Sequence, residues 1–89
     1  MERIVLATGY DMNQDEYRLC FIKEKEEFAT WFMGTDVHKQ EKIYLQGHYF
    51  NNPKKAIQDL KSRVCLSEVE SYIEFEYTPL EIINKNKNI

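Results

Sequence analysis

The stretch YLQGHYFNNPKKAIQDL, residues 44–60, passes from an extended aromatic pattern to a helical one. Asn52 is suited to cap a helix, and Pro53 suits the first helical position, where the missing N–H has no intrahelical partner to lose. Apolar residues then recur at helical spacing at Ala56, Ile57, Leu60 and Val64. The sequence therefore predicts one amphipathic helix over about residues 53–65.

Gly47 interrupts the strand that we expect over residues 43–50. An isolated glycine inside a strand often marks a bulge or a close approach of another backbone. In a regular strand Tyr44, His48 and Phe50 share one face, which would offer an aromatic surface to a ligand. The alternative is that the helix packs across this face and buries at least Phe50, because a small sheet needs cover.

The chain before this strand contains three further runs that are typical of strands, over residues 3–10, 17–23 and 28–33. Turn residues separate them. The segment 34–40 also has turn composition and no apolar period, so we expect a loop there. The second and third runs are apolar on both faces, which indicates a sheet that is covered on both sides.

Beyond the helix, residues 71–77 alternate in the manner of a fifth strand, and Pro79 ends it. Ser67 could instead cap a short helix, so the structure of residues 67–77 stays open at this point. The predicted fold is α+β: an antiparallel meander of four to five strands with one amphipathic helix packed on one face. We expect a single compact domain over residues 1–83 and a frayed polar tail over 84–89.

The composition of the 89-residue chain is that of one small folded domain, with 43% hydrophobic and 13% aromatic residues. The sequence has no apolar export segment after Met1 and no run of 18 apolar residues. Its two cysteines, Cys20 and Cys65, fit reduced thiols. We therefore expect a cytoplasmic protein with no membrane contact.

Recognisable catalytic and metal-binding signatures are missing from the sequence. Cys20, His38, His48 and Cys65 match no zinc-ligand spacing, and no nucleophile with a base and an orienting group stands out. The three glycines are too scattered to cradle a phosphate. We expect no metal, no cofactor and no enzymatic activity, with both thiols structural.

Acidic residues concentrate near the C-terminus. The net charge is −3, but residues 1–63 carry ten basic and ten acidic side chains, whereas residues 64–83 carry five glutamates and no base. Such a surface would repel phosphates, so nucleic acid is an unlikely partner and a basic protein surface is the expected one.

The candidate partner-binding residues are Glu68, Glu70, Glu74 and Glu76, with Tyr72 as an aromatic anchor among them. On a strand, every second residue points to the same face at intervals of about 7 Å, a spacing close to that of phosphates along DNA. The row therefore permits a mimic of nucleic acid. The simpler interpretation is that solvated glutamates protect an edge strand against aggregation.

A second interpretation places function on the sheet. Tyr44, Tyr49 and Phe50, beside Lys39 and Lys42, faintly resemble the aromatic and basic pattern of sheets that bind single-stranded nucleic acid. We keep this as the alternative function.

A homodimer is a further expectation. One short helix leaves the second face of the sheet, with Cys20, Ile22, Trp31 and Met33, in need of cover. A second copy of the chain would provide it.

Three segments carry a resemblance to known proteins: EFATW at 27–31, GHYF at 47–50 and AIQDLKSR at 56–63. Together they resemble small accessory proteins of phages and conjugative elements of low-GC Gram-positive bacteria. The resemblance implies a non-catalytic module that binds and blocks a host protein, of the anti-CRISPR or anti-restriction type. It carries no functional residue over to this chain.

Overall fold

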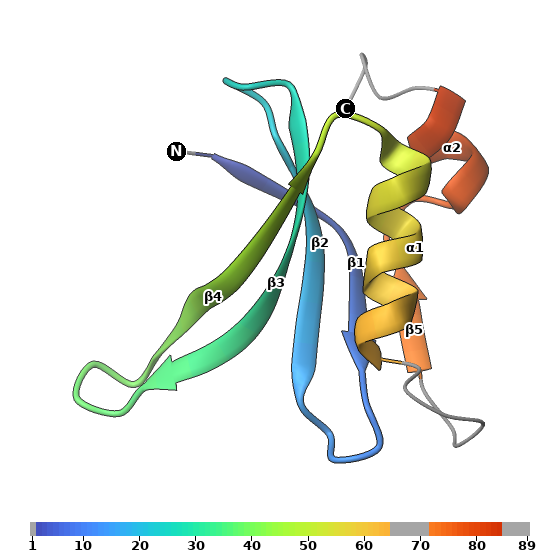
Figure 1. The fold of residues 1–89 in the computed structure, drawn as a ribbon. Coiled ribbons are helices and arrows are strands. Elements are labelled where there is room, and N and C mark those ends of the chain that lie inside the picture. The colour runs from blue at the N-terminus through green and yellow to red at the C-terminus, as the bar shows by residue number, and fades with distance from the viewer. Residues whose placement is uncertain (1, 65–71, 85–89) are drawn as a thin grey trace.

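The computed structural model describes residues 2–64 and 72–84 of the chain. Its elements follow one another as β1 (Arg3–Tyr10), β2 (Glu16–Ile22), β3 (Glu27–Asp36), β4 (Glu41–Phe50), α1 (Pro53–Val64), β5 (Tyr72–Phe75) and α2 (Pro79–Asn84). The strands form one antiparallel sheet in the order β4-β3-β2-β1-β5, and both helices lie on one side of it (Figure 1). The predicted α+β fold and the fifth strand are confirmed.

Helix α1 begins as its sequence predicts. The side-chain Oδ1 of Asn52 accepts a hydrogen bond from the backbone N–H of Lys54 at 2.8 Å, and Pro53 occupies the first helical position. This cap satisfies a donor that the first turn would otherwise leave unpaired. The apolar stripe is buried against the sheet at the four predicted positions, which are Ala56, Ile57, Leu60 and Val64.

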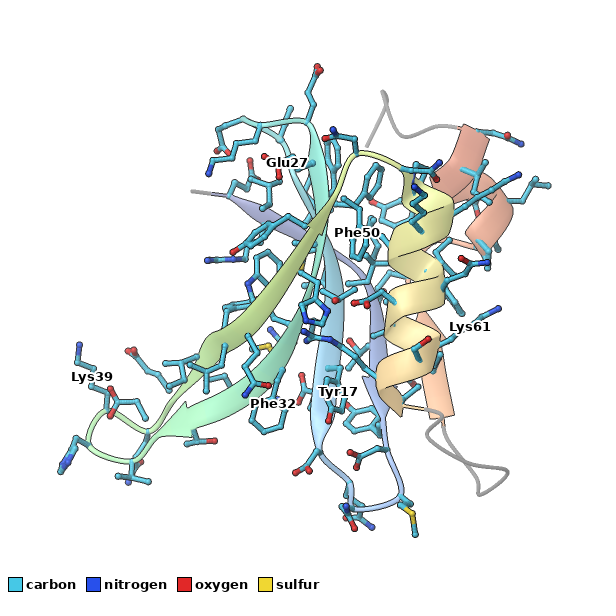
Figure 2. All side chains as sticks on the ribbon, viewed as in Figure 1. Tyr17, Glu27, Phe32, Lys39, Phe50 and Lys61 are labelled. Atoms are coloured by element: carbon cyan, nitrogen blue, oxygen red, sulfur yellow. The ribbon has the colours of Figure 1, made fainter. Side chains whose placement is uncertain are left out.

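The main core lies between α1, α2 and the sheet. Its buried sheet residues include Leu6, Leu19, Phe21 and Phe28, and Phe50 packs against them from β4. Figure 2 shows Phe50 close to the start of α1. The helix therefore covers this end of the sheet face, as the alternative for Phe50 predicted.

The opposite face of the sheet has a smaller core of its own. It consists of Cys20, Ile22, Ala29, Trp31 and Met33. The exposed fraction is 3% for Trp31 and 7% for Met33, and the other three residues are at most 1% exposed.

Side chains of the same sheet cover this second core. The guanidinium of Arg3 lies 5.0 Å from the ring centre of Trp31 and 4.3 Å from that of Tyr44. The ring of Tyr49 meets Trp31 edge-on, with ring centres 5.8 Å apart. Bulges in β1 and β4 add to the twist that brings these strands together, and Figure 1 shows that β1 changes direction along its length.

This arrangement bears on the expected homodimer. The four residues that motivated it, Cys20, Ile22, Trp31 and Met33, are already buried within one chain. A second copy is therefore not needed to cover them. Dimerisation remains a prediction, but an uncovered apolar face no longer supports it.

The loop predicted over residues 34–40 is wrong in extent. Strand β3 continues to Asp36 and pairs with β4 down to Asp36 opposite Glu41, so only a short turn remains between the strands. The turn closes because Oδ1 of Asp36 accepts the backbone N–H of His38 at 3.0 Å. We call the outer part of this hairpin, residues 32–45, the arm; it projects away from α1 (Figure 1).

A second short helix, α2, follows β5 and was not predicted. Thr78 and Glu81 form a reciprocal capping box, in which each side chain accepts the other residue's backbone N–H, at 3.2 and 3.1 Å. The helix then buries Ile82 completely in the main core. The signal was present in the sequence as Thr-Pro-Leu-Glu, residues 78–81.

Candidate functional site

Of the predicted acidic row, the structure describes Glu74 and Glu76: Glu74 lies on β5, an edge strand of the sheet, and Glu76 directly follows it. Ile73 and Phe75 pack against the main core, whereas Glu74 and Glu76 are exposed. Glu74 stands opposite Thr8 of β1, and the backbone N–H of Glu76 donates to the carbonyl of Leu6 at 2.8 Å. The sheet and the core thus fix the backbone that carries these two carboxylates.

The remaining members of the predicted acidic row are only partly described. Glu68 and Glu70 lie outside the described residues. The backbone of Tyr72 begins β5 and pairs with Tyr10 of β1. The structure therefore brings Glu74 and Glu76 together at the sheet edge.

The predicted aromatic face of β4 is divided between the two sides of the sheet. Thr30 of β3 pairs with His48, but Phe32 pairs with Leu45, so Gln46 and Gly47 together face a single residue of β3. This bulge shifts the alternation by one residue. Tyr44 consequently belongs to the second core, while Phe50 joins the main core.

Tyr44 takes part in packing rather than being displayed to a ligand. Its ring contacts Trp31 edge-on, with ring centres 5.1 Å apart, and its hydroxyl accepts a hydrogen bond from Arg18 at 2.9 Å. Tyr49, by contrast, is 56% exposed although it touches Trp31. The expectation that Tyr44, His48 and Phe50 form one continuous aromatic surface is therefore corrected.

His48 belongs to a polar cluster between β4, β3 and α1, which we call the His48 cluster: Thr30, His48, Asp59 and Arg63. Oδ2 of Asp59 lies 2.9 Å from Nδ1 of His48 and accepts the hydroxyl of Thr30 at 2.5 Å. Nε of Arg63 lies 3.2 Å from the same Nδ1 and 3.5 Å from Oδ2 of Asp59. Half of the His48 side chain is exposed.

Arg63 is the most enclosed charged side chain of this cluster, with 10% of its side chain exposed. Burial lowers the pKa of its guanidinium, although Asp59 and Tyr17 act in the opposite direction. Nη2 donates a short hydrogen bond to the carbonyl of Gln46, whereas Nη1 is buried without a hydrogen-bond partner among the described residues. The ring of Tyr17 lies 5.9 Å from the centre of the guanidinium.

Sequence reasoning identified only His48 of this cluster. The spacing of Asp59 and Arg63, four residues apart on one helix, indicates an ion pair but not its contact with β4. Thr30, the one buried polar residue in the described ranges, lies in an apolar run that reads as core. Only the tertiary packing of α1 on β3 and β4 brings these residues together.

The structure gives no support to a metal site within residues 2–64 and 72–84. No group of three or more His, Cys, Asp or Glu side chains could hold an ion there. Cys20 is fully buried in the second core, and burial raises the pKa of its thiol to about 12. Such a thiol stays protonated near neutral pH and is a poor nucleophile. Cys65 lies outside the described residues.

Comparisons with protein families, with curated proteins and with solved structures find no match to this chain. The resemblance to accessory proteins of mobile elements therefore stays a prediction. Among the helices of the described segments, none has the length and apolar character that crossing a membrane requires.

Proposed function

We propose that the protein is a non-catalytic binding module of a mobile element, which inhibits a host defence or nucleic-acid-handling protein through its acidic C-terminal region. The observation that supports the proposal is the way in which the fold holds Glu74 and Glu76. Both side chains are exposed, while Ile73 and Phe75 hold the same segment against the core. Carboxylates on a fixed backbone can meet a basic surface with little loss of backbone entropy.

The charge distribution supports a basic partner. The five glutamates between residues 64 and 83 are accompanied by no lysine or arginine in that segment. Acidic side chains of this kind steer a basic partner during encounter and disfavour acidic ones. We assign the contacts to Glu68, Glu70, Glu74 and Glu76, with Tyr72 as the anchor.

The alternative, binding of single-stranded nucleic acid by sheet aromatics, has less support. Base stacking requires open aromatic rings beside basic groups. Tyr44 is engaged with Arg3, Arg18 and Trp31, and Phe50 packs in the core. The ring of Tyr49 remains exposed, but a single ring offers little surface on which bases could stack.

The proposal is tested by affinity capture from a lysate of a low-GC Gram-positive bacterium. Three baits are compared: the wild type, Glu74→Lys/Glu76→Lys, and a control with Glu24→Lys/Glu41→Lys, which reverses two exposed charges far from β5 in sequence. We expect the wild type and the control to retain a common protein that the first variant loses. Equal capture by all three baits would contradict the proposal, as would binding of single-stranded oligonucleotides at low salt without any protein partner.

A further inference from the structure

Two neighbours of His48 favour opposite protonation states of the same ring nitrogen, Nδ1. Oδ2 of Asp59, 2.9 Å from Nδ1, favours a proton on that nitrogen. The Nε–H of Arg63 is directed at the same Nδ1 at 3.2 Å and needs a lone pair there. A ring nitrogen either donates or accepts, so only one of these hydrogen bonds forms at a time.

Arg63 has an alternative to its bond with His48. Its Nε lies 3.5 Å from Oδ2 of Asp59, so a small movement would exchange the histidine for the carboxylate. Its Nη1 is buried and lacks an acceptor among the described residues, a costly situation for a charged group. The observed position of the guanidinium therefore leaves it with unmet hydrogen-bonding capacity.

The third nitrogen of Arg63 connects α1 to the base of the arm. Nη2 donates to the carbonyl of Gln46, which lies in the bulge of β4 and has a φ of 51°. Left-handed backbone is uncommon for a residue other than glycine and depends on its surroundings to persist. Arg63 is thus well placed to hold the bulge from which the arm extends.

We propose that His48 is a proton-controlled latch between helix α1 and the arm. With a neutral ring whose Nδ1 is unprotonated, Arg63 bonds both His48 and Gln46 and ties the helix to β4. When the ring is protonated, Nδ1–H donates to Asp59, and the positive imidazolium repels Arg63. Arg63 then turns toward Asp59 on its own helix, and its hold on the bulge weakens.

The groups that face His48 are consistent with this switch. Helix α1 contributes Asp59 and Arg63, β3 contributes the uncharged hydroxyl of Thr30, and Tyr17 of β2 lies beyond Arg63. Imidazole is the side chain that ordinarily changes charge between pH 5 and 8. The arm should therefore change its connection to α1 when His48 gains or loses a proton, independently of the acidic surface that Glu74 and Glu76 form.

The latch is tested by following NMR signals of the ¹⁵N-labelled protein from pH 8 to pH 5.5. The informative signals are the side-chain Nε–H of Arg63, the backbone amides of Gln46 and Gly47, and the ring nitrogens of His48. We expect the Arg63 and Gln46 signals to move with the same midpoint as the His48 ring. Ring nitrogen shifts should also report a proton on Nε2 and none on Nδ1 at pH 8.

Two variants separate the latch from other titrations. His38→Asn removes the histidine at the tip of the arm and should leave these changes intact, whereas His48→Gln should abolish them. His48 is half-exposed, so its replacement should not prevent folding. A His48 ring that titrates while Arg63 and Gln46 stay fixed would overturn the proposal, as would a proton on Nδ1 at pH 8.

Discussion

Gly47 lies directly against the buried indole of Trp31: a Cβ atom at residue 47 would be 2.6 Å from Nε1 of Trp31. The glycine is thus required by a neighbour across the strands rather than by its own backbone, since the positive φ in this bulge belongs to Gln46. Trp31 is 3% exposed and has little room to withdraw. The bulge, the second core and the position of His48 are consequently linked through this one contact.

Gly47→Ala should destabilise the fold, because the added methyl group overlaps the Trp31 ring and the hydroxyl of Tyr49. We expect the free energy of unfolding to fall by about 1–3 kcal/mol, measured by urea denaturation. Gly34→Ala is the matched control: its nearest contact, 2.7 Å away, is the end of the Leu45 side chain, which is 40% exposed and can move. If Gly47→Ala and Gly34→Ala lose the same free energy of unfolding, the contact of residue 47 with Trp31 is not what requires a glycine there.

Glu16→Gln should reduce the acid sensitivity of the protein. Burial raises the pKa of Glu16, but hydrogen bonds and charges from Lys42 and Arg18 outweigh it, so the net shift is downward from 4.5. A depressed carboxyl pKa contributes stability that is present above pH 4.5 and is lost as the pH falls through the folded-state value.

The measurement is the free energy of unfolding at pH 7 and at pH 3.5. Glu16→Gln should lower the free energy of unfolding at pH 7. The difference between the free energies of unfolding at pH 7 and at pH 3.5 should therefore become smaller than in the wild type. Glu41→Gln changes an exposed glutamate on β4 and serves as the control. If Glu16→Gln leaves this difference in unfolding free energy unchanged, the ion pairs of Glu16 with Lys42 and Arg18 do not stabilise the fold.

Thr78→Ala should loosen α2. The substitution removes the hydroxyl that accepts the backbone N–H of Glu81, and caps of this kind contribute about 1 kcal/mol. Because Ile82 is buried in the main core, the loss should appear in global unfolding. Thr35→Ala, an exposed threonine in the arm, is the comparison. If both variants unfold at the same urea concentration as the wild type, the capping box does not contribute.

Cys20 should resist thiol reagents in the folded protein. Its side chain is fully buried, and its raised pKa, about 12, leaves almost no thiolate at pH 8. In a Cys65→Ser background, labelling should be slow in buffer and fast in denaturing urea. Rapid labelling of the folded protein would mean that the second core opens readily.

The sequence predicted the features that depend on neighbouring residues. Asn52 and Pro53 located the start of α1, and Gly47 located the bulge. The consequence of the bulge could not be predicted in the same way, because a one-residue offset reverses which side chains face the helix. Regular alternation therefore predicts one face for Tyr44 and Phe50, although the two side chains lie on opposite faces of the sheet.

Cover of the second face was also beyond the sequence pattern. Arg3 reaches Trp31 and Tyr44 only because the sheet twists, and twist is a property of all its strands together. The same holds for Asp59 and Arg63, whose contacts with β3 and β4 depend on how α1 packs. The acidic pattern at β5, by contrast, could be predicted from the sequence, because the alternation of charged and apolar residues is a local property.

Association kinetics show whether Glu74 and Glu76 contribute to the binding of a basic partner. The protein retained in affinity capture is purified, and its association rate is measured against ionic strength for the wild type and for Glu74→Lys/Glu76→Lys. We expect a wild-type association rate that falls steeply with added salt, and a variant rate that is lower and nearly independent of salt. Identical rates and salt dependence for the two proteins would contradict the binding proposed for Glu74 and Glu76.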